Sequence, residues 1–365
     1  MKFDTNDGLS QGDYRAEVDA FDADEWASII SGFDDATVYQ CAQHAEVRAG
    51  LTNSSRLALR HGNRIVGAAQ IKIKMIPALR AGVADVYCGP LWRIGGERPD
   101  PEIFRQMIRA LRQEYVATRN LFLRIRSNEF GQVVPVLDAL LKEEGFSQTS
   151  VFRNPGTFLI DLSPSLEELR MGFSKGSRKN LRRAERRGMT VSTGCDRDAF
   201  DKFALLYEEM FVRKVTVARE DIESFWRIHE RLPDDLKLRF EICEADGEPV
   251  SASVWSKVGE RAIGLFRANG FRAMELGSSY LLSWHLIQAM KAAGARYYDL
   301  GNSRSPGNAG FKARTGAKAV SYLPPHYAGN SLAGKLCGLW GERISHRKTR
   351  LKIALGRLKR RVTSS

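Results

Sequence analysis

The stretch GSSYLLSWHLIQAMKAAGARYYDLGNSRSPGNAGFKARTGAKAVSYLPP, residues 277–325, decides the fold of this chain. In its first part, apolar residues recur at three- and four-residue steps, which places them on one face of a helix: Leu282, Leu286, Ala289, Met290 and Ala293. Small and hydroxyl residues at 277–279 favour a helix start, and Gly294 favours its end. The sequence therefore predicts a helix that starts at residues 277–279 and ends at Gly294.

The remainder of the stretch alternates between strand and helix. Residues 296–300 predict a short buried strand, and a polar, glycine-rich loop follows at 301–308. Phe311 and Lys312 are expected to open a short helix, and residues 319–323 predict a closing strand. Strands that alternate with helices are typical of an α/β protein.

Two features of this stretch can carry chemistry. The first backbone N–H groups of the predicted helix, at Ser278, Ser279 and Tyr280, can face an anion, because a helix start presents unpaired donors and a partial positive charge. An ordinary helix cap is the alternative. Asp299 ends a predicted strand and Lys312 follows the loop beyond it, at the kind of strand end where open α/β sheets bind ligands. A solvated surface lysine is the alternative for Lys312.

The two halves of the chain contain the same elements in the same order. Both carry a β-hairpin, a strand, a helix and a further strand, and matching landmarks lie 185, 179 and 175 residues apart: Gly62 and Gly247, Val83 and Ala262, Leu121 and Arg296. Two copies of one unit are the simplest interpretation. We expect loosely ordered residues 1–20, a first domain at 21–190, a second domain at 191–330 and a basic tail at 331–365.

A cluster of positive charge lies in residues 165–187. We expect this segment to be largely helical, although Gly172 and Gly176 weaken its middle. Its cations are Lys175, Arg178, Lys179, Arg182, Arg183, Arg186 and Arg187. Such a run is either a solvated helix face or a site for phosphates, which arginine binds with two parallel hydrogen bonds.

At these two stretches the chain resembles the FemAB-type transferases, a tandem branch of the GNAT superfamily. The run YYDLGNSRSPGNAGFKARTGA is similar to the family's C-terminal signature, through Tyr298, Asp299, Gly301, Phe311, Lys312 and Gly316. The run TFLIDLSPSLEELRMGFSKGSRKNLRRAERRGM is similar to the family's strand, acidic helix start and basic helix, through Asp161, Leu162, Glu167, Glu168, Arg178, Asn180 and Gly188. The resemblance covers residues 25–325 and implies two GNAT-like domains, each a mixed sheet flanked by helices.

The resemblance also implies a function. Proteins of this type move an acyl or aminoacyl group onto an amine of a cell-envelope precursor, for peptidoglycan or exopolysaccharide. Lys312 would stabilise the negative charge that grows on the carbonyl oxygen and leaving group, Phe311 would shape the wall, and Asp299 and Gly301 would form the crevice floor. The other expected substrate-binding residues are Ser278, Ser279, Tyr280, Arg304, Arg178 and Asn180.

The donor and two other functions stay open. The GNAT coenzyme A signature, Arg/Gln-x-x-Gly-x-Gly/Ala, is not cleanly present, and residues 277–279 are a partial substitute. We expect no tightly bound cofactor, with aminoacyl-transfer RNA or acyl-CoA as the donor. One alternative is an N-acyltransferase that uses acyl-CoA or acyl carrier protein on an amino sugar. The other is a non-catalytic protein that binds RNA or a membrane through its basic surfaces.

Composition favours anionic partners. The net charge of +13 and the pI of about 9.6 suit a phosphate-bearing precursor, transfer RNA or a membrane surface. Five scattered cysteines, with no Cys-x-x-Cys, and six histidines without metal-like clustering indicate neither disulfides nor a metal site. We expect no signal peptide and no membrane-spanning run, and hence a cytoplasmic protein.

The tail carries a separate pattern. Its apolar residues fall largely at three- and four-residue steps, with Lys and Arg between them: Trp340, Ile344, Leu351, Leu355, Leu358 and Val362. A basic amphipathic C-terminal helix suits the inner face of an anionic membrane, contacted through residues 336–365. An RNA contact, or packing on the second domain, is the alternative.

Overall fold

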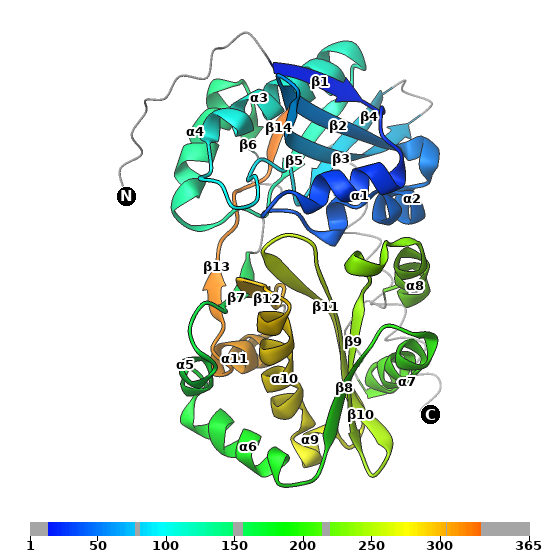
Figure 1. Ribbon diagram of the computed structural model, residues 1–365, viewed down its shortest axis with the longest axis vertical. Helices are drawn as coiled ribbons and strands as arrows, with labels where there is room; N and C mark the ends of the chain where they lie inside the picture. The colour runs from blue at the N-terminus through cyan, green and yellow to red at the C-terminus, as the bar shows by residue number, and fades with distance from the viewer. Residues whose placement is uncertain (1–13, 77–80, 149–155, 214–219, 304, 330–365) are drawn as a thin grey trace, which may run out of the picture.

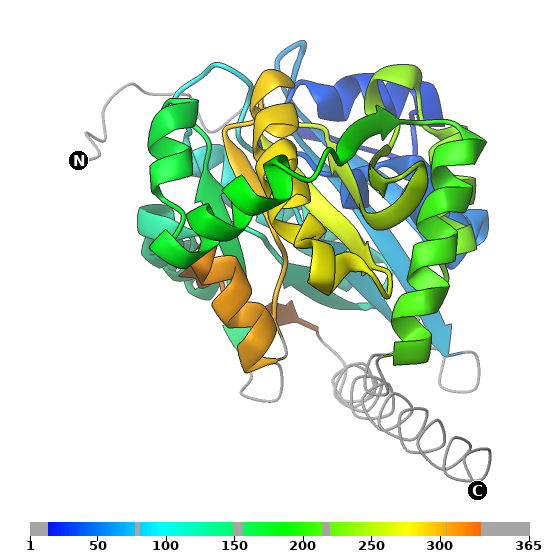
Figure 2. The ribbon, with the colours of Figure 1, turned by 90° about the horizontal axis from the view of Figure 1, so that it is seen from below.

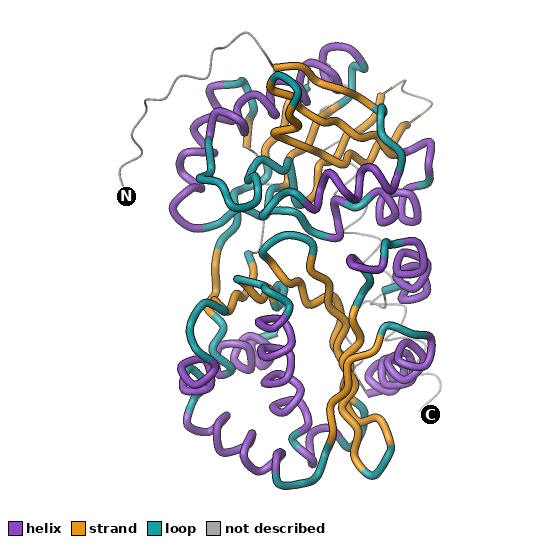
Figure 3. The backbone as a smooth tube through the Cα atoms, viewed as in Figure 1, coloured by secondary structure: helices purple, strands orange, loops and turns teal. Residues whose placement is uncertain are grey.

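The computed structural model describes residues 14–76, 81–148, 156–213, 220–303 and 305–329. It consists of two units, one above the other in Figure 1, and each unit is built on a seven-stranded sheet. Helices lie on both sides of each set of strands (Figure 3). The predicted α/β fold with two mixed sheets is confirmed.

The first sheet is antiparallel except at one pair of neighbours. Its strands, in spatial order, are β1 (Tyr14–Val18), β2 (Ser54–His61), β3 (Arg64–Ile76), β4 (Ala81–Tyr87), β5 (Phe122–Arg126), β14 (His326–Ala328) and β6 (Ser147–Gln148). Strands β4 and β5 are the parallel pair, and the helix between them makes the crossover that parallel neighbours require.

The second sheet repeats this arrangement. Its strands, in the matching order, are β8 (Thr190–Gly194), β9 (Arg239–Ala245), β10 (Glu248–Lys257), β11 (Arg261–Asn269), β12 (Tyr297–Asp299), β7 (Thr157–Asp161) and β13 (Lys318–Val320). Strands β11 and β12 are its parallel pair. Hairpin, strand, helix and strand therefore recur in the same order, as the landmark spacing predicted.

The sixth position of each sheet is filled by a strand from a distant part of the chain. Strand β7 precedes the rest of the second unit and lies between β12 and β13. Strand β14 follows the second unit and returns to lie between β5 and β6. The sequence analysis placed the domain boundary between residues 190 and 191. The sheets divide the chain earlier, because β7 and the two helices after it pack with the second sheet.

Helices cover both faces of both sheets. In the first unit they are α1 (Ala23–Ser31), α2 (Ala42–Ala49), α3 (Pro101–Leu111), which continues as a π-helix to Thr118, and α4 (Val134–Glu143). In the second they are α5 (Leu166–Met171), α6 (Lys175–Glu185), α7 (Arg197–Arg213), α8 (Ile222–Arg231), α9 (Ala273–Leu276), α10 (Ser278–Ala292) and α11 (Pro306–Arg314). Helices α3 and α10 occupy matching places in the sequence, because each connects the two parallel strands of its sheet.

A shared hydrophobic cluster joins the two units. Buried side chains of the first unit, including Trp26 and Ile30 of α1, belong to the same cluster as Phe200 and Phe203 of α7. Two other clusters lie under α3 and α4 and under α5, α6 and α10. Backbone hydrogen bonds from 259–260 to 34–36, of 2.8 and 3.1 Å, add a polar tie between the units.

Three local predictions need correction. Residues 14–18 form β1 instead of a loose terminus, because the five residues pair antiparallel with β2. The basic segment is two helices, since the Ser174 hydroxyl accepts the Ser177 N–H and starts a new helix there. Helix α11 begins at Pro306, inside the predicted loop, because Ser305 caps it, so Phe311 and Lys312 lie in its second half.

Two predictions fall on other parts of the chain. Residues 1–13 and the basic tail lie outside the described residues. None of the helices within the described part combines the length and the apolar character that crossing a bilayer requires.

Candidate functional site

Of the three N–H groups predicted to face an anion at the start of α10, that of Tyr280 already donates to the Gly277 carbonyl oxygen, at 3.0 Å. Gly277 precedes α10 with a φ of +71°, and no side chain caps the first turn. Helix α3, its counterpart in the first unit, is capped by the Asp100 carboxylate and carries Glu102 in its first turn. A carboxylate therefore already neutralises the partial positive charge at the N-terminus of α3. At the matching N-terminus of α10, no side-chain cap neutralises this charge.

A pocket of about 350 Å³ lies at this helix start. It brings together four of the predicted residues: Ser279 and Tyr280 of α10, Phe311 of α11 and Asn180 of α6. The other lining residues are Arg183, Ala273, Met274, Glu275, Leu276 and Gly277. The two sequence motifs, more than 100 residues apart, therefore meet at one cavity, with the α6 side supplying a cation.

Five predicted substrate-binding residues are not in this lining: Asp299 and Gly301, described below, and Ser278, Arg178 and Arg304. Ser278 is buried, and its hydroxyl lies 3.4 Å from the Ala273 carbonyl oxygen. The Arg178 guanidinium donates to the carbonyls of Met171 and Phe173 and so closes the turn between α5 and α6. Arg304 lies outside the described residues.

Lys312 is buried, and its ammonium group is fully engaged. Nζ donates to the carbonyl oxygens of Leu300, Gly301 and Asn302 at 2.6, 2.9 and 3.0 Å. Burial lowers its pKa to about 8, while Asp299 opposes the shift. The three acceptors match the three protons of an ammonium, so Lys312 holds the loop after β12 in place. Its predicted role in charge stabilisation stays a prediction.

The predicted floor of the crevice is a saturated polar cluster. The Asp299 carboxylate accepts from the hydroxyls of Thr157 and Tyr322 and from the Gly301 N–H at 2.8 Å. Arg261 Nη1 lies 3.9 Å from the same carboxylate. Asp299 is buried, so these partners compensate a charge that would otherwise be costly in the interior. The cluster fixes β7, β11 and β12 together below the loop.

Arg267 lies beside the pocket and supports it, and sequence reasoning missed this residue. From β11, Nη2 donates to the Ser279 carbonyl at 2.6 Å and to the Ser283 hydroxyl at 2.9 Å. Its guanidinium lies 5.4 Å from the centre of the Phe311 ring. Burial lowers its pKa. The available signal was an arginine inside β11, whose other residues between 262 and 268 are apolar or glycine.

Comparisons with known proteins agree with this architecture. Residues 172–313 match the family model of the acetyltransferase (GNAT) domain. The crystal structure of FemX is similar with a TM-score of 0.75 at 16% identity, over 88% of this chain and 99% of that one. A conserved protein of unknown function from Bacteroides thetaiotaomicron gives a TM-score of 0.55 at 11% identity, over 87% and 100%. No curated protein matches.

The chain shares its fold with FemX, and its second unit is similar to a GNAT domain. The FemAB resemblance inferred from two motifs is thereby confirmed at the level of the fold. The family-model match covers α6 and α10, which build the pocket, so this part of the second unit is similar to an acetyltransferase (GNAT) domain.

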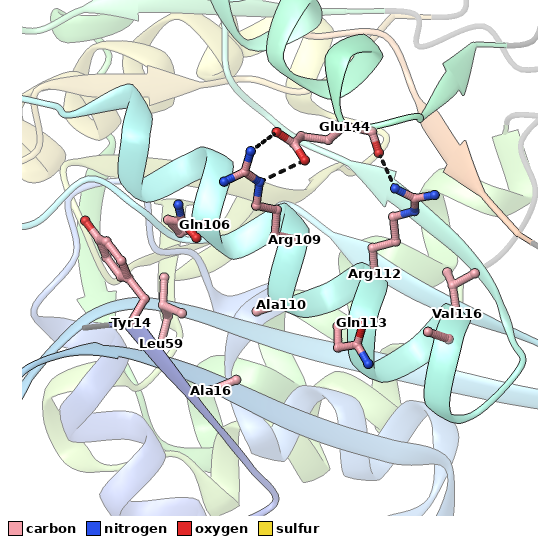
Figure 4. A pocket seen from close by; sticks show the side chains of 11 residues that line it. Tyr14, Ala16, Leu59, Gln106, Arg109, Ala110, Arg112, Gln113, Val116 and Glu144 are labelled. Atoms are coloured by element: carbon pink, nitrogen blue, oxygen red, sulfur yellow. Dashed lines mark hydrogen bonds and ion pairs between the residues drawn. The ribbon is translucent and has the colours of Figure 1, made fainter. Parts of the chain in front are cut away.

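The first unit also carries a cavity, of about 550 Å³, between β1, β2 and α3 (Figure 4). Two of its lining arginines turn toward one glutamate. Arg109 donates to the Glu144 carboxylate at 2.9 Å, and Arg112 donates to the Glu144 carbonyl oxygen at 3.0 Å. Because these cations already have internal partners, this cavity offers an anion less than the pocket at α10 does.

The pocket at the start of α10 suits the binding of an anionic group beside a reacting carbonyl. The α10 start and Arg183 supply positive potential, while Tyr280 and Phe311, with ring centres 5.4 Å apart, supply an apolar wall. Fixed positive potential stabilises charge that develops on a carbonyl oxygen or leaving group without reorganisation. Acyl transfer to an amine needs this and no metal-ligand set.

Proposed function

We propose that this protein transfers an acyl or aminoacyl group from a phosphate-bearing donor to an amine of a cell-envelope precursor. The observation that carries the proposal is the pocket at the start of α10, where both FemAB-like motifs meet beside an uncapped helix and Arg183. Phosphates bind well at helix N-termini and pair with arginine in two parallel hydrogen bonds. We assign the donor phosphate to this pocket.

The reaction follows from this placement. The amine nitrogen attacks the carbonyl carbon of an ester or thioester, and an amide C–N bond forms. The C–O or C–S bond breaks, and the leaving alcohol or thiol takes up the proton that the nitrogen gives up. Negative charge passes through the carbonyl oxygen to the leaving group, so positive potential near both lowers the barrier. Arg267 orients Phe311 and the first turn of α10, and Lys312 orients the loop beside them.

Two donor classes fit this chemistry. Aminoacyl-transfer RNA fits the basic surface, because RNA binding rests largely on phosphate contacts. Acyl-CoA is the second candidate, because the matching family model is an acetyltransferase domain. Both present phosphates and a reactive carbonyl, and they differ in the size of the anion.

The test is product identification. The purified full chain is incubated with aminoacyl-transfer RNA or acyl-CoA, each against peptidoglycan precursors and amino sugars, and amide products are identified by mass spectrometry. An amide product from either donor supports the proposal and names the donor. If phosphate-bearing donors bind but no amide forms with any acceptor of the panel, the transferase proposal is wrong.

A further inference from the structure

Helix α6 presents an unusually bare cationic face. Its buried side is formed by Ser177, Leu181 and Ala184. Its exposed side carries the cations Lys175, Lys179, Arg182, Arg183 and Arg186. Across the part of the chain that the structure describes, no hydrogen bond or ion pair engages these five side chains. Like charges on one helix face repel each other, so an anionic partner is favoured there.

The neighbouring arginines differ in this respect. Arg170 pairs with Glu185 at 2.8 Å, and the Arg187 guanidinium donates to the Glu275 carbonyl. The second contact joins the end of α6 to α9. The bare cations are therefore confined to the outward face of α6, and α9 lies directly beside them.

Large apolar side chains stand exposed on the same surface. Met274 of α9 is 81% exposed and Phe271, just before α9, is 57% exposed. Met274 lines the pocket together with Arg183 and Asn180 of α6. At the other end of α6, Met171 is 60% exposed, and its carbonyl accepts from Arg178 at 2.8 Å. The surface that carries α6 and α9 is at the lower end of Figure 1 and faces the viewer in Figure 2.

We propose that this α6–α9 surface docks on an anionic phospholipid bilayer. The cations of α6 outside the pocket, Lys175, Lys179, Arg182 and Arg186, would lie at the level of the lipid phosphates. Phe271 and Met274 would enter the interface. Cationic side chains beside exposed apolar ones are the pattern of interfacial membrane binding. A nucleic acid would use the cations but would gain little from Met274. The proposal does not depend on the proposed function, and it concerns a surface separate from residues 336–365.

The test measures binding of the full chain to vesicles by co-sedimentation at low salt. One set contains phosphatidylglycerol mixed with phosphatidylcholine, and the other contains phosphatidylcholine alone. Two double variants probe the surface: Lys179→Gln with Arg186→Gln, and Phe271→Ser with Met274→Ser. Matched controls change exposed residues elsewhere: Arg98→Gln with Arg231→Gln, and Leu205→Ser. Thermal unfolding of each variant checks that the fold is kept.

We expect tighter binding to the anionic vesicles. Each neutralised cation should weaken it by about fivefold, so the charge variant loses about 25-fold. The apolar variant should lose about tenfold, and both controls should bind like the wild type. Equal binding of the two vesicle sets overturns the proposal, as do surface variants that bind like the wild type. A charge variant that loses affinity for vesicles and for transfer RNA, beside an unaffected apolar variant, also overturns it and indicates a nucleic-acid surface.

Discussion

Replacing Lys312 by methionine tests whether this lysine acts in catalysis, as the motif implies, or holds the loop after β12, as its contacts indicate. The motif assigns the lysine charge to catalysis, whereas the structure gives its three protons to the carbonyls of Leu300, Gly301 and Asn302. Methionine has a similar length and no donor, so the change removes the charge and all three hydrogen bonds with little change in volume.

The expected loss of stability follows from these contacts. Hydrogen bonds to charged groups contribute about 1.5–3 kcal/mol each, but burial of the ammonium offsets part of the gain, as its lowered pKa shows. The loop carbonyls can also regain water, because Gly301 and Asn302 are not fully buried. We therefore expect Lys312→Met to lower the free energy of unfolding by about 2–4 kcal/mol.

Turnover should fall further than stability. If the charge also stabilises the leaving group, the single-turnover rate at a temperature where both proteins are folded should drop about a hundred- to a thousandfold. Lys312→Arg should recover only part of this, because the planar guanidinium cannot meet three carbonyls in the same geometry. Equal single-turnover rates for wild type and Lys312→Met would remove Lys312 from catalysis. Unchanged stability would refute its role in holding the loop.

Three further predictions concern the scaffold. Burial raises the pKa of Asp35 from 3.8 to about 8, with Glu129 adding to the shift; the folded state then binds this proton more tightly than the unfolded state, so the free energy of unfolding should fall between about pH 4 and pH 8. Asp35→Asn should remove that fall in urea unfolding, and an unchanged slope would contradict the assignment. Gly277→Ala should lower the free energy of unfolding by about 1–2 kcal/mol, because the φ of Gly277 is +71°. The control Gly176→Ala should raise it by about 1 kcal/mol, because Gly176 has helical backbone and open space around it. Similar effects at both sites would argue against a strained start of α10. Glu241→Ala should lower the free energy of unfolding by about 2–4 kcal/mol, because the donors of Trp255 and Thr193 lose their buried acceptor. A denaturation midpoint like that of the wild type would show that these contacts contribute little to stability.

Local patterns predicted the repeated fold well. The hairpins around Gly62 and Gly247 and the periodicity of α10 are read from neighbouring residues, and spacing alone revealed the duplication. The return of β14 to the first sheet could not be read in this way. Residues 326–328 form a very short strand whose place is set by pairing with β5 and β6, more than 170 residues away. Long-range pairing of this kind leaves no periodic signal in the sequence.

The sequence predicted which residues line the pocket better than it predicted what each residue does there. The motifs named Asn180 and Phe311, the predicted helix start named Ser279 and Tyr280, and all four meet at one pocket. They could not show that Arg178 turns back on its own backbone, because capping contacts depend on where α5 ends. Arg267 was missed because its partners come from α10 and α11, and a strand pattern reveals only which face a residue occupies.

The most direct test of the central claim is the KM of the donor for Arg183→Gln beside the matched control Arg98→Gln. Arg183 lines the pocket at α10, whereas Arg98 is an exposed arginine of the first unit, and neither change should disturb the fold. If the donor phosphate binds at the start of α10, Arg183→Gln should raise the KM about 10- to 100-fold, as the loss of a charged hydrogen bond does, while Arg98→Gln leaves it unchanged. An equal KM for wild type and both variants would contradict the assignment of the donor to this pocket.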